Sequence, residues 1–347
     1  MIGPFSKETS VKKALAPVGL LAAILGSFLL INGCGKQDNS SQTNGSSTQP
    51  SASSQLTIAV IPKGTTHAYW QSVQAGAEKA GQEFGATIIY KGPLLESDVA
   101  GQQNLVEDFV GQGVSGIVLA PIDDAALLSP VQASTAKGIP VVVIDSALKG
   151  VNGTDYVSFV STNNRVGGEM AGDEMTKLLG GKGKLVMLRY TEYSASTNDR
   201  EAGFLDSIQK SPGFTILVAN QYGGATEATA QEKAEDLLDL LQQADGIYCP
   251  NESTTLGMLH VLEQHNLAGK VKFVGFDATP REVDGMKANE IDSLVAQDPV
   301  KMGYLGVKAC IDHIQGKPVD AVIDSGVKLI TQDNLNDPDI QKFLAGG

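Results

Sequence analysis

The sequence has few of the residues on which several common classes of protein depend. Of its 347 residues, 3 are cysteine, 4 are histidine and 1 is tryptophan. Three cysteines cannot form a disulfide framework, and the spacing of the histidines does not predict a metal site. The Gly-x-Ser-x-Gly and His-Glu-x-x-His motifs of two large hydrolase classes do not occur. We therefore expect neither a metal ion nor another cofactor.

Positive charge is also scarce. The chain has 26 Lys and Arg residues against 39 Asp and Glu residues, which gives a formal net charge of −13. A protein that binds a nucleic-acid backbone needs a surplus of cations to neutralise phosphates. We therefore expect no nucleic-acid partner, and the acidity mainly indicates solubility.

The longest apolar run lies close to the N-terminus. Lys7, Lys12 and Lys13 precede an apolar stretch over residues 14–31, a pattern typical of a secretory signal. The sequence LINGC that ends at Cys34 resembles the lipobox of bacterial lipoproteins. We expect residues 1–33 to be a lipoprotein signal peptide and Cys34 to be lipidated. An uncleaved membrane anchor with an incidental cysteine is the alternative.

The segment after the cysteine has almost no apolar residues. Residues 34–55 are rich in Ser, Gln, Asn, Gly and Thr, and such a composition cannot bury enough surface to offset the entropy of ordering. We expect a flexible tether there. The protein would then be an exported, membrane-anchored lipoprotein that faces the periplasm or the cell exterior.

Strand-like and helix-like segments alternate from Leu56 to the end of the chain. This alternation predicts βαβ units and parallel sheets, and hence an α/β fold. The pattern occurs twice in succession, which predicts two similar domains. Strands are expected at 56–61, 86–90, 116–120, 140–145, 156–160, 184–190, 215–219, 246–249, 271–276, 292–296 and 327–331. A helix is expected after the loop that ends at Trp70, with Val73, Ala77 and Ala80 on one face. Further helices are expected over 97–112, 124–137, 164–179, 196–210, 226–243, 253–265, 282–287 and 300–315, with a short one after Pro338.

Polar residues follow several of the predicted strands directly. Asp145, Asn251 and Asp277 each come after a short apolar run, and the first strand leads into a loop that contains Tyr69 and Trp70. Open α/β folds bind ligands at the carboxyl ends of their strands. Carboxylates, amides and aromatic rings there suit a ligand with many hydroxyl groups. For any one of these residues, capping of the next helix is the alternative.

Motifs along the folded part resemble one known family. They are TTHAYW at 65–70, VVVIDSA at 141–147, STNNRVGGEMAG at 161–172, NDREAGF at 198–204, NESTTLGML at 251–259, VGFDATP at 274–280 and AQDP at 296–299. Together they resemble periplasmic sugar-binding proteins of the ribose-binding type. These are substrate receptors of ABC importers and are related to the ligand-binding core of LacI repressors.

The resemblance implies two Rossmann-like lobes with parallel sheets, joined by three crossovers. It implies an N-terminal lobe of residues 56–162 plus 298–325, and a C-terminal lobe of residues 163–297 plus 326–347. In this arrangement a hinge closes the two lobes over one small sugar. Asn163 and Asn164 would lie at a crossover, where we expect them to cap the following helix.

The resemblance also implies the positions of the ligand-binding residues. Tyr69 and Trp70 would stack on the sugar ring. Ser146 and Asn198 stand where ribose binders commonly have Arg, so ribose itself is not implied. The full set is His67, Tyr69, Trp70, Asp145, Ser146, Asn198, Arg200, Tyr222, Asn251, Asp277 and Gln297. Arg189 and Tyr190, at another strand end, could also reach the cleft.

The implied function is capture of a small sugar and its delivery to the membrane permease of an ABC importer, by a protein that acts as a monomer. A sugar sensor for a chemoreceptor or histidine kinase is an alternative with the same fold. A glycosidase-like enzyme that uses Asp145, Glu252 and Asp277 is a further one. A repressor is disfavoured because residues 1–55 hold a signal and a tether. Cys249 and Cys310 are expected to be buried, with pairing between them left open.

Overall fold

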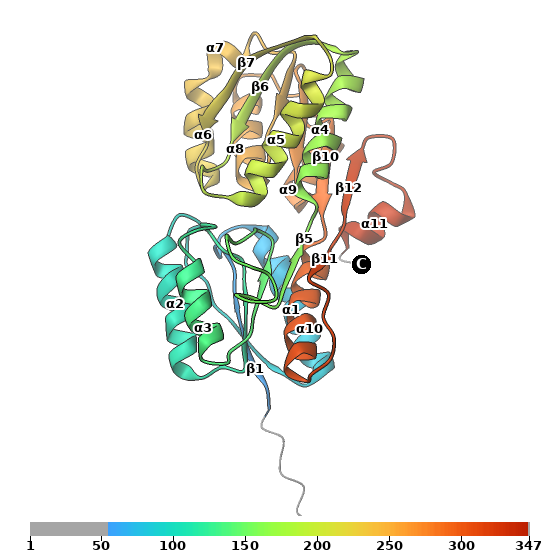
Figure 1. Ribbon diagram of the computed structural model, residues 1–347. Coiled ribbons are helices and arrows are strands. Elements are labelled where there is room, and N and C mark those ends of the chain that lie inside the picture. Colours follow the sequence, from blue (N-terminus) through green and yellow to red (C-terminus); the bar gives the residue numbers. More distant parts are fainter. Residues whose placement is uncertain (1–54, 346–347) are drawn as a thin grey trace, which may run out of the picture. The chain divides into compact units, whose positions relative to one another are not determined.

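The computed structural model describes residues 55–345, whose strands form two six-stranded sheets (Figure 1). We call the first sheet and its helices the first lobe, and the second sheet and its helices the second lobe. In the first sheet all neighbouring strands are parallel. Its order is β2-β1-β3-β4-β5-β11, with β1 (Thr57–Ile61), β2 (Thr87–Tyr90), β3 (Gly116–Leu119), β4 (Val141–Ile144), β5 (Ser158–Ser161) and β11 (Val322–Asp324).

The second sheet repeats this order. It is parallel except for its last strand, which runs antiparallel to its neighbour. The order is β7-β6-β8-β9-β10-β12, with β6 (Lys182–Arg189), β7 (Gly213–Tyr222), β8 (Gly246–Tyr248), β9 (Lys272–Phe276), β10 (Ser293–Gln297) and β12 (Val327–Thr331). The two lobes are therefore two copies of one α/β pattern, as the sequence predicted.

Helices cover both faces of each sheet, and this explains why the central strands β3, β4, β8 and β10 are buried along their whole length. In β1, Ile58 and Val60 pack under α1 and α10, whereas Ala59 and Ile61 pack under α2 and α3. The first-lobe helices are α1 (Ala68–Phe84), α2 (Val99–Gln112), α3 (Leu128–Ala136) and α10 (Pro299–Ile314).

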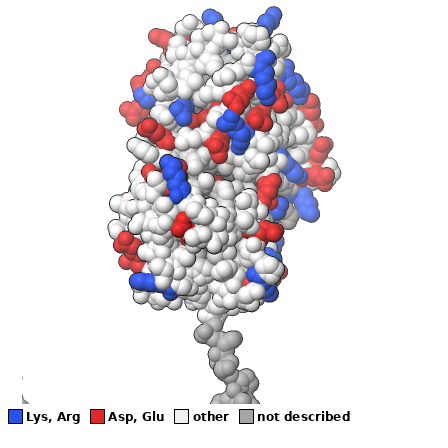
Figure 2. Space-filling view, viewed as in Figure 1, with Lys and Arg blue, Asp and Glu red and all other residues white. Residues whose placement is uncertain are grey.

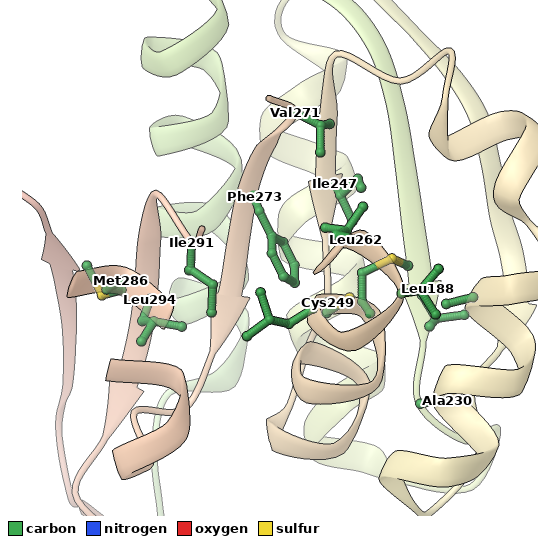
Figure 3. Close-up of a cluster of buried hydrophobic side chains, with 14 of the residues drawn as sticks. Leu188, Ala230, Ile247, Cys249, Leu262, Val271, Phe273, Met286, Ile291 and Leu294 are labelled. Carbon is green, nitrogen blue, oxygen red and sulfur yellow. The ribbon is translucent and has the colours of Figure 1, made fainter. Parts of the chain in front are cut away.

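The second lobe has the same two-sided core. Leu185 and Met187 of β6 pack with the side chains of α4 and α5, and Val186 and Leu188 pack with those of α6, α8 and α9. Figure 3 shows the second of these clusters, in which Phe273 and Leu262 lie beside Cys249. The helices are α4 (Asn164–Leu179), α5 (Ala195–Gln209), α6 (Glu227–Asp236), α7 (Leu238–Leu241), α8 (Glu252–Gln264), α9 (Pro280–Lys287) and α11 (Pro338–Leu344).

The chain passes between the lobes three times. It leaves the first sheet after β5, returns between β10 and α10, and crosses again between β11 and β12. Two of the crossovers contact each other, because the Ser325 amide donates to the Ser161 carbonyl oxygen at 3.0 Å. Thr162 Oγ1 also lies 3.3 Å from Ser325 Oγ. The crossovers are thus bonded to one another at the carboxyl ends of β5 and β11.

Three elements differ from the sequence-based expectation. The predicted helix at 124–137 begins only at Leu128, because Asp123 Oδ1 accepts from the amides of Ala125 and Ala126 and stabilises a turn instead. The predicted helix at 226–243 is interrupted at Leu237, so that it forms α6 and α7. Strand β11 was not predicted, since it has only 3 residues and lies at a sheet edge.

The cysteines of the described part are free. Cys249 and Cys310 are both buried, and each packs in the core of a different lobe. They are therefore small apolar core residues, as expected, and they do not pair with each other. Cys34 lies outside the described residues. Within residues 55–345 no helix combines the length and the apolar character that crossing a membrane requires.

Candidate ligand site between the lobes

Polar side chains at the strand ends of both lobes enclose one small cavity. Its volume is about 30 Å³, enough for water molecules but not for a sugar ring. Most of its walls follow β1, β4, β6, β8, β9 and β10, as the rule for open α/β folds anticipates. The lining residues are Lys63, His67, Tyr69, Trp70, Glu96, Asp145, Tyr190, Ser194, Ser196, Thr197, Arg200, Asn251, Glu252, Asp277 and Gln297.

Two aspartates occupy equivalent positions in the two lobes and share an unusual backbone conformation. Asp145 follows β4 with φ 63°, and Asp277 follows β9 with φ 81°. The Asp145 amide donates to the Val160 carbonyl oxygen at 3.0 Å, and the Asp277 amide donates to that of Val295 at 2.9 Å. The left-handed region is unfavourable for residues with a Cβ, although Asp and Asn tolerate it best. Such strain is often found at functional sites.

In the first lobe a lysine neutralises the aspartate. Lys63 Nζ lies 2.8 Å from Asp145 Oδ2, and both side chains are buried. Tyr69 OH donates to Asp145 Oδ1 at 3.0 Å. The same ammonium group reaches the second lobe, where it donates to Ser196 Oγ at 3.2 Å and Ser194 Oγ at 3.4 Å. Lys63 therefore connects both walls of the cavity.

Glu96 is the centre of a second first-lobe cluster. Its carboxylate accepts from His67 Nδ1 at 2.6 Å and from Trp70 Nε1 at 2.7 Å. Tyr190 OH, from the second lobe, donates to the other oxygen at 2.6 Å. His67 Nε2 lies 3.2 Å from the Ala225 carbonyl oxygen, also in the second lobe. The cluster fixes the Trp70 ring and contacts the opposite lobe at two points.

The pKa values of this pair indicate a buried ion pair. Burial would lower the pKa of His67, but the adjacent Glu96 carboxylate outweighs it and raises the pKa to about 9. Burial would raise the pKa of Glu96, whereas the charge and hydrogen bond of His67 lower it to about 2. Both groups are therefore charged at neutral pH.

The second-lobe carboxylates are bound by amides instead of cations. Asp277 accepts from the Glu252 amide at 2.8 Å and from Gln297 Nε2 at 2.7 Å. Glu252 accepts from the amides of Ala68 and Tyr69, both at 3.0 Å, at the start of α1 in the first lobe. Helix N-termini favour negative charge, which stabilises the Glu252 carboxylate there. Because Glu252 belongs to the second lobe, these hydrogen bonds are a further contact between the lobes. Burial raises the pKa of Glu252.

Arg200 lies against the cavity but does not form an ion pair with Asp277. Its Nε donates to Asn164 Oδ1 at 2.8 Å and its Nη1 to the Pro250 carbonyl oxygen at 2.9 Å. The guanidinium lies over the Phe276 ring, 3.9 Å from the centroid. Burial raises the pKa of Asp277, and the nearby Arg200 opposes this without cancelling it.

Helix capping and ligand binding were the alternative roles for the asparagines at the strand ends. Asn251 caps α8 by accepting from the Thr254 amide at 3.4 Å, and it also lines the cavity. Capping and a place in the cavity are therefore compatible. Asn163 caps α4 by accepting from the Val166 amide at 3.2 Å, as expected, and is exposed. Asn164 does not cap, because it is the first residue of α4 and its Oδ1 accepts from Arg200 Nε.

The structure brings most of the predicted ligand residues together. His67, Tyr69, Trp70, Asp145, Arg200, Asn251, Asp277 and Gln297 all line the cavity. Ser146 lies just behind it, where its Oγ accepts from the Ser196 amide at 3.1 Å.

Two predicted residues lie elsewhere. Asn198 accepts from Arg189 Nη2 at 3.3 Å, and the same guanidinium lies 4.5 Å from the Tyr222 ring centroid. Tyr222 lines a separate hollow with Thr191 and Glu192. The roles of all eleven residues in ligand binding stay predictions.

Sequence reasoning missed several of the lining residues. Lys63 and Glu96 were not among the predicted residues, nor were Ser194, Ser196 and Thr197. Lys63 follows the β1 strand end by two positions, so the rule applied to Asp145 could have found it. Glu96 lies in an irregular segment between β2 and α2 and has no such signal. Within residues 55–345 no grouping of His, Cys, Asp and Glu is suited to a metal ion.

Two α/β lobes with three crossovers, and a cavity lined by strand ends of both, define the type I periplasmic-binding fold. Comparison with known proteins agrees. The sequence profile of the periplasmic binding protein domain matches residues 58–318. The chain therefore belongs to the periplasmic binding protein family, and the resemblance to its ribose-binding type is confirmed. Membership implies a location outside the cytoplasm.

Individual relatives are similar over most of the chain. The ribose import binding protein RbsB of Haemophilus influenzae is 30% identical over 81% of this chain and 94% of its own. The D-allose-binding periplasmic protein of Escherichia coli is 27% identical over 73% of this chain and 83% of its own. A carbohydrate transporter solute-binding protein from Agrobacterium radiobacter, solved with D-arabinose, has a TM-score of 0.80 at 32% identity. It covers 84% of this chain and 100% of its own.

Proposed function

We propose that this protein is the substrate-binding lipoprotein of an ABC importer and that it captures a small sugar between its two lobes. The main support for this proposal is the cavity, because carboxylates, amides and aromatic rings from both lobes line it. Related proteins named for ribose and allose, and one solved in complex with D-arabinose, support a sugar as the ligand. The strand order supports lobes of residues 56–162 plus 298–325 and of 163–297 plus 326–347.

The binding groups divide into two kinds. The carboxylates of Asp145 and Asp277 accept from sugar hydroxyls, and the amides of Asn251 and Gln297 can both donate and accept. Tyr69 and Trp70 provide the aromatic faces, with ring centroids 4.9 Å apart and an interplanar angle of 86°. Leaving one of these buried groups without a matching hydroxyl costs about 1–3 kcal/mol, which is the source of selectivity.

Ligand capture requires the lobes to open. The cavity of about 30 Å³ is too small to admit a sugar, and Lys63, Glu96 and Glu252 each bond across it. Opening breaks these contacts, and a ligand that touches both walls favours the closed state. The crossovers after β5, β10 and β11 are the hinge of this motion.

Export and anchoring are part of the proposal and depend on residues outside the described part. The apolar stretch at 14–31 and the Cys that follows support a signal peptide and lipidation at Cys34. Cys34→Ala should release the protein from the membrane fraction into the soluble fraction. Unchanged sedimentation of this variant would favour an uncleaved anchor.

The sole tryptophan allows a direct test of ligand binding. The chain has 1 Trp, Trp70, and its side chain is buried in the cavity wall. A ligand that enters should change the intrinsic fluorescence and raise the melting temperature. At a ligand concentration a hundredfold above Kd, binding adds about 2.7 kcal/mol to the unfolding free energy. A screen of pentoses, hexoses, polyols and their derivatives by both methods is decisive. If no member of such a panel changes either signal, the protein is not a sugar receptor.

A further inference from the structure

Charge is balanced in the first-lobe wall of the cavity. Asp145 has the Lys63 ammonium at 2.8 Å, and Glu96 has the His67 imidazolium at 2.6 Å. Each buried carboxylate of this wall therefore has a cation of the same lobe in direct contact. Such pairing is the usual condition for burying a charge.

Charge is not balanced in the second-lobe wall. Asp277 is 5% and Glu252 is 7% exposed, yet the groups that donate to them are backbone amides and the Gln297 side chain. Neither forms an ion pair with any side chain of residues 55–345. Arg200, a second-lobe cation that lines the cavity, directs its donors to Asn164 and to the Pro250 carbonyl oxygen.

An unused acceptor lies beside these carboxylates. Gln297 is 6% exposed, and its Oε1 has no hydrogen-bond partner while its Nε2 donates to Asp277. An unmatched buried acceptor costs free energy unless a ligand supplies a donor. The second-lobe wall therefore presents two carboxylates and an amide oxygen, all of them acceptors.

We infer that the ligand is a sugar or polyol with a protonated amino group, bound by Asp277, Glu252 and Gln297 Oε1. This inference rests on the proposed function and concerns the same site. An ammonium group has three donors and a full charge, so it satisfies the acceptors and neutralises the carboxylates at once. Its role in the second lobe matches that of Lys63 in the first.

The pKa values of the carboxylates support this assignment. Burial raises the pKa of Asp277 and of Glu252, with Arg200 and His67 respectively opposing the rise. The Asp145 carboxylate across the cavity contributes to the raised pKa of Asp277. A ligand cation beside Asp277 and Glu252 would lower the pKa of both carboxylates. The attraction between the cation and the carboxylates that lowers these pKa values also contributes to the free energy of binding.

Matched series of ligands test the charge directly. Each series contains a neutral sugar, its amino derivative, its N-acetylated derivative and its uronic acid, for example glucose, glucosamine, N-acetylglucosamine and glucuronic acid. Galactose and mannose derivatives form parallel series, and inositol is compared with its amino and N-acetylated derivatives. Affinities come from Trp70 fluorescence and calorimetry at pH 7. The amino compound of at least one series should bind at least tenfold more tightly than its neutral, acetylated and acidic counterparts.

Asp277→Asn is the variant that isolates the charge. Asn tolerates the left-handed backbone at this position, and the Gln297 amide can rotate to present Oε1 to the new amide group. In Asp277→Asn the ratio of affinities for the amino compound and its neutral counterpart should fall below threefold. Glu252→Gln should independently lower the same ratio. Glu232→Gln, at an exposed carboxylate of the same lobe, is the control and should leave the preference unchanged.

The outcomes separate this inference from the proposed function. Binding of neutral sugars as tight as that of their amino derivatives overturns the inference and supports the proposed function. Preferred binding of uronic acids does the same. A preference for the amino compound that survives both Asp277→Asn and Glu252→Gln also overturns it. If no compound of any series binds, the proposed function fails as well.

Discussion

The two lobes share one backbone plan, but the buried carboxylates of their ligand walls have different partners. Both sheets have the same strand order, and in both an aspartate with positive φ follows the fourth strand of that order, Asp145 after β4 and Asp277 after β9. Each aspartate amide donates to the neighbouring strand. The repeated pattern therefore fixes where the two carboxylates lie, and it leaves their partners free to differ.

The partners differ sharply. Asp145 has Lys63, whereas Asp277 has amide donors only. The four arginines of the chain, Arg165, Arg189, Arg200 and Arg281, all belong to the second lobe. Figure 2 shows acidic and basic side chains intermixed on that lobe at the top of the view. Arginines in the same lobe therefore do not guarantee an ion pair with Asp277. Whether an ion pair forms depends on where each guanidinium directs its donors.

The largest expected effect comes from removing each aspartate charge in turn. Asp145→Asn leaves the Lys63 ammonium buried without its partner, and such a loss costs about 3–5 kcal/mol. Asp277→Asn removes a charge that has no ion-pair partner, so the unfolding free energy should stay the same or rise. Urea unfolding of the two variants without ligand measures the difference.

The double variant Lys63→Met with Asp145→Asn is the control for this comparison. Removing both partners should restore much of the stability lost by Asp145→Asn, because no buried charge then lacks a partner. Equal destabilisation by Asp145→Asn and Asp277→Asn would contradict the contrast between the lobes.

The next effect concerns pH and the His67–Glu96 pair. The pKa of His67 is raised to about 9 from its ordinary value of 6.5, so its contribution to stability is complete below pH 6.5. Above that pH the folded state holds a proton that the unfolded state has lost. Stability should therefore fall as pH rises from 6.5 to 9, by about 3 kcal/mol in total.

The acids of the two lobes should respond to pH in opposite directions. Glu96 has a pKa lowered from 4.5 to about 2, so its contribution is present above pH 4.5 and is lost toward pH 2. Burial raises the pKa of Glu252, so its contribution is lost as pH rises through that raised pKa. Glu96→Gln should flatten the decline between pH 6.5 and 9 measured by urea unfolding. An NMR titration that gives His67 a pKa near 6.5 would contradict the buried ion pair.

The sequence predicted the fold and about half of the cavity wall, partly from local patterns and partly from the family resemblance, which supplied His67, Arg200 and Gln297. A short apolar run that ends in Asp145, Asn251 or Asp277 specifies a buried strand and a polar group at its end. These residues do lie together. Strand β11 escaped prediction because 3 residues at a sheet edge carry no periodic signal.

The remaining cavity residues depend on contacts between distant parts of the chain. Glu96 becomes part of the wall only because His67, Trp70 and Tyr190 all donate to it. Asn198 was placed by resemblance, but its side chain bonds to Arg189. A resemblance transfers a position along the chain, whereas the direction of a side chain depends on its neighbours in space.

The smallest expected effect tests whether the lobes also share their helix packing. The α1–α10 pair and the α4–α5 pair are close because glycines lie at the contacts. A Cβ at Gly303 would meet the Val73 carbonyl oxygen, and one at Gly168 would meet that of Arg200. Such overpacking costs about 1–3 kcal/mol, so Gly303→Ala and Gly168→Ala should lower the unfolding free energy by similar amounts.

The matched control for this pair is a helical glycine with space around it. A Cβ at Gly111 in α2 would have no neighbouring atom within 4 Å, so Gly111→Ala should stabilise the protein by about 0.5–1 kcal/mol. Gly168→Ala should also weaken ligand binding, because it displaces the backbone of Arg200 against the cavity. If Gly168→Ala and Gly303→Ala were as well tolerated as Gly111→Ala, the close helix contacts would not be a shared constraint. The likeness of the lobes would then be limited to their sheets.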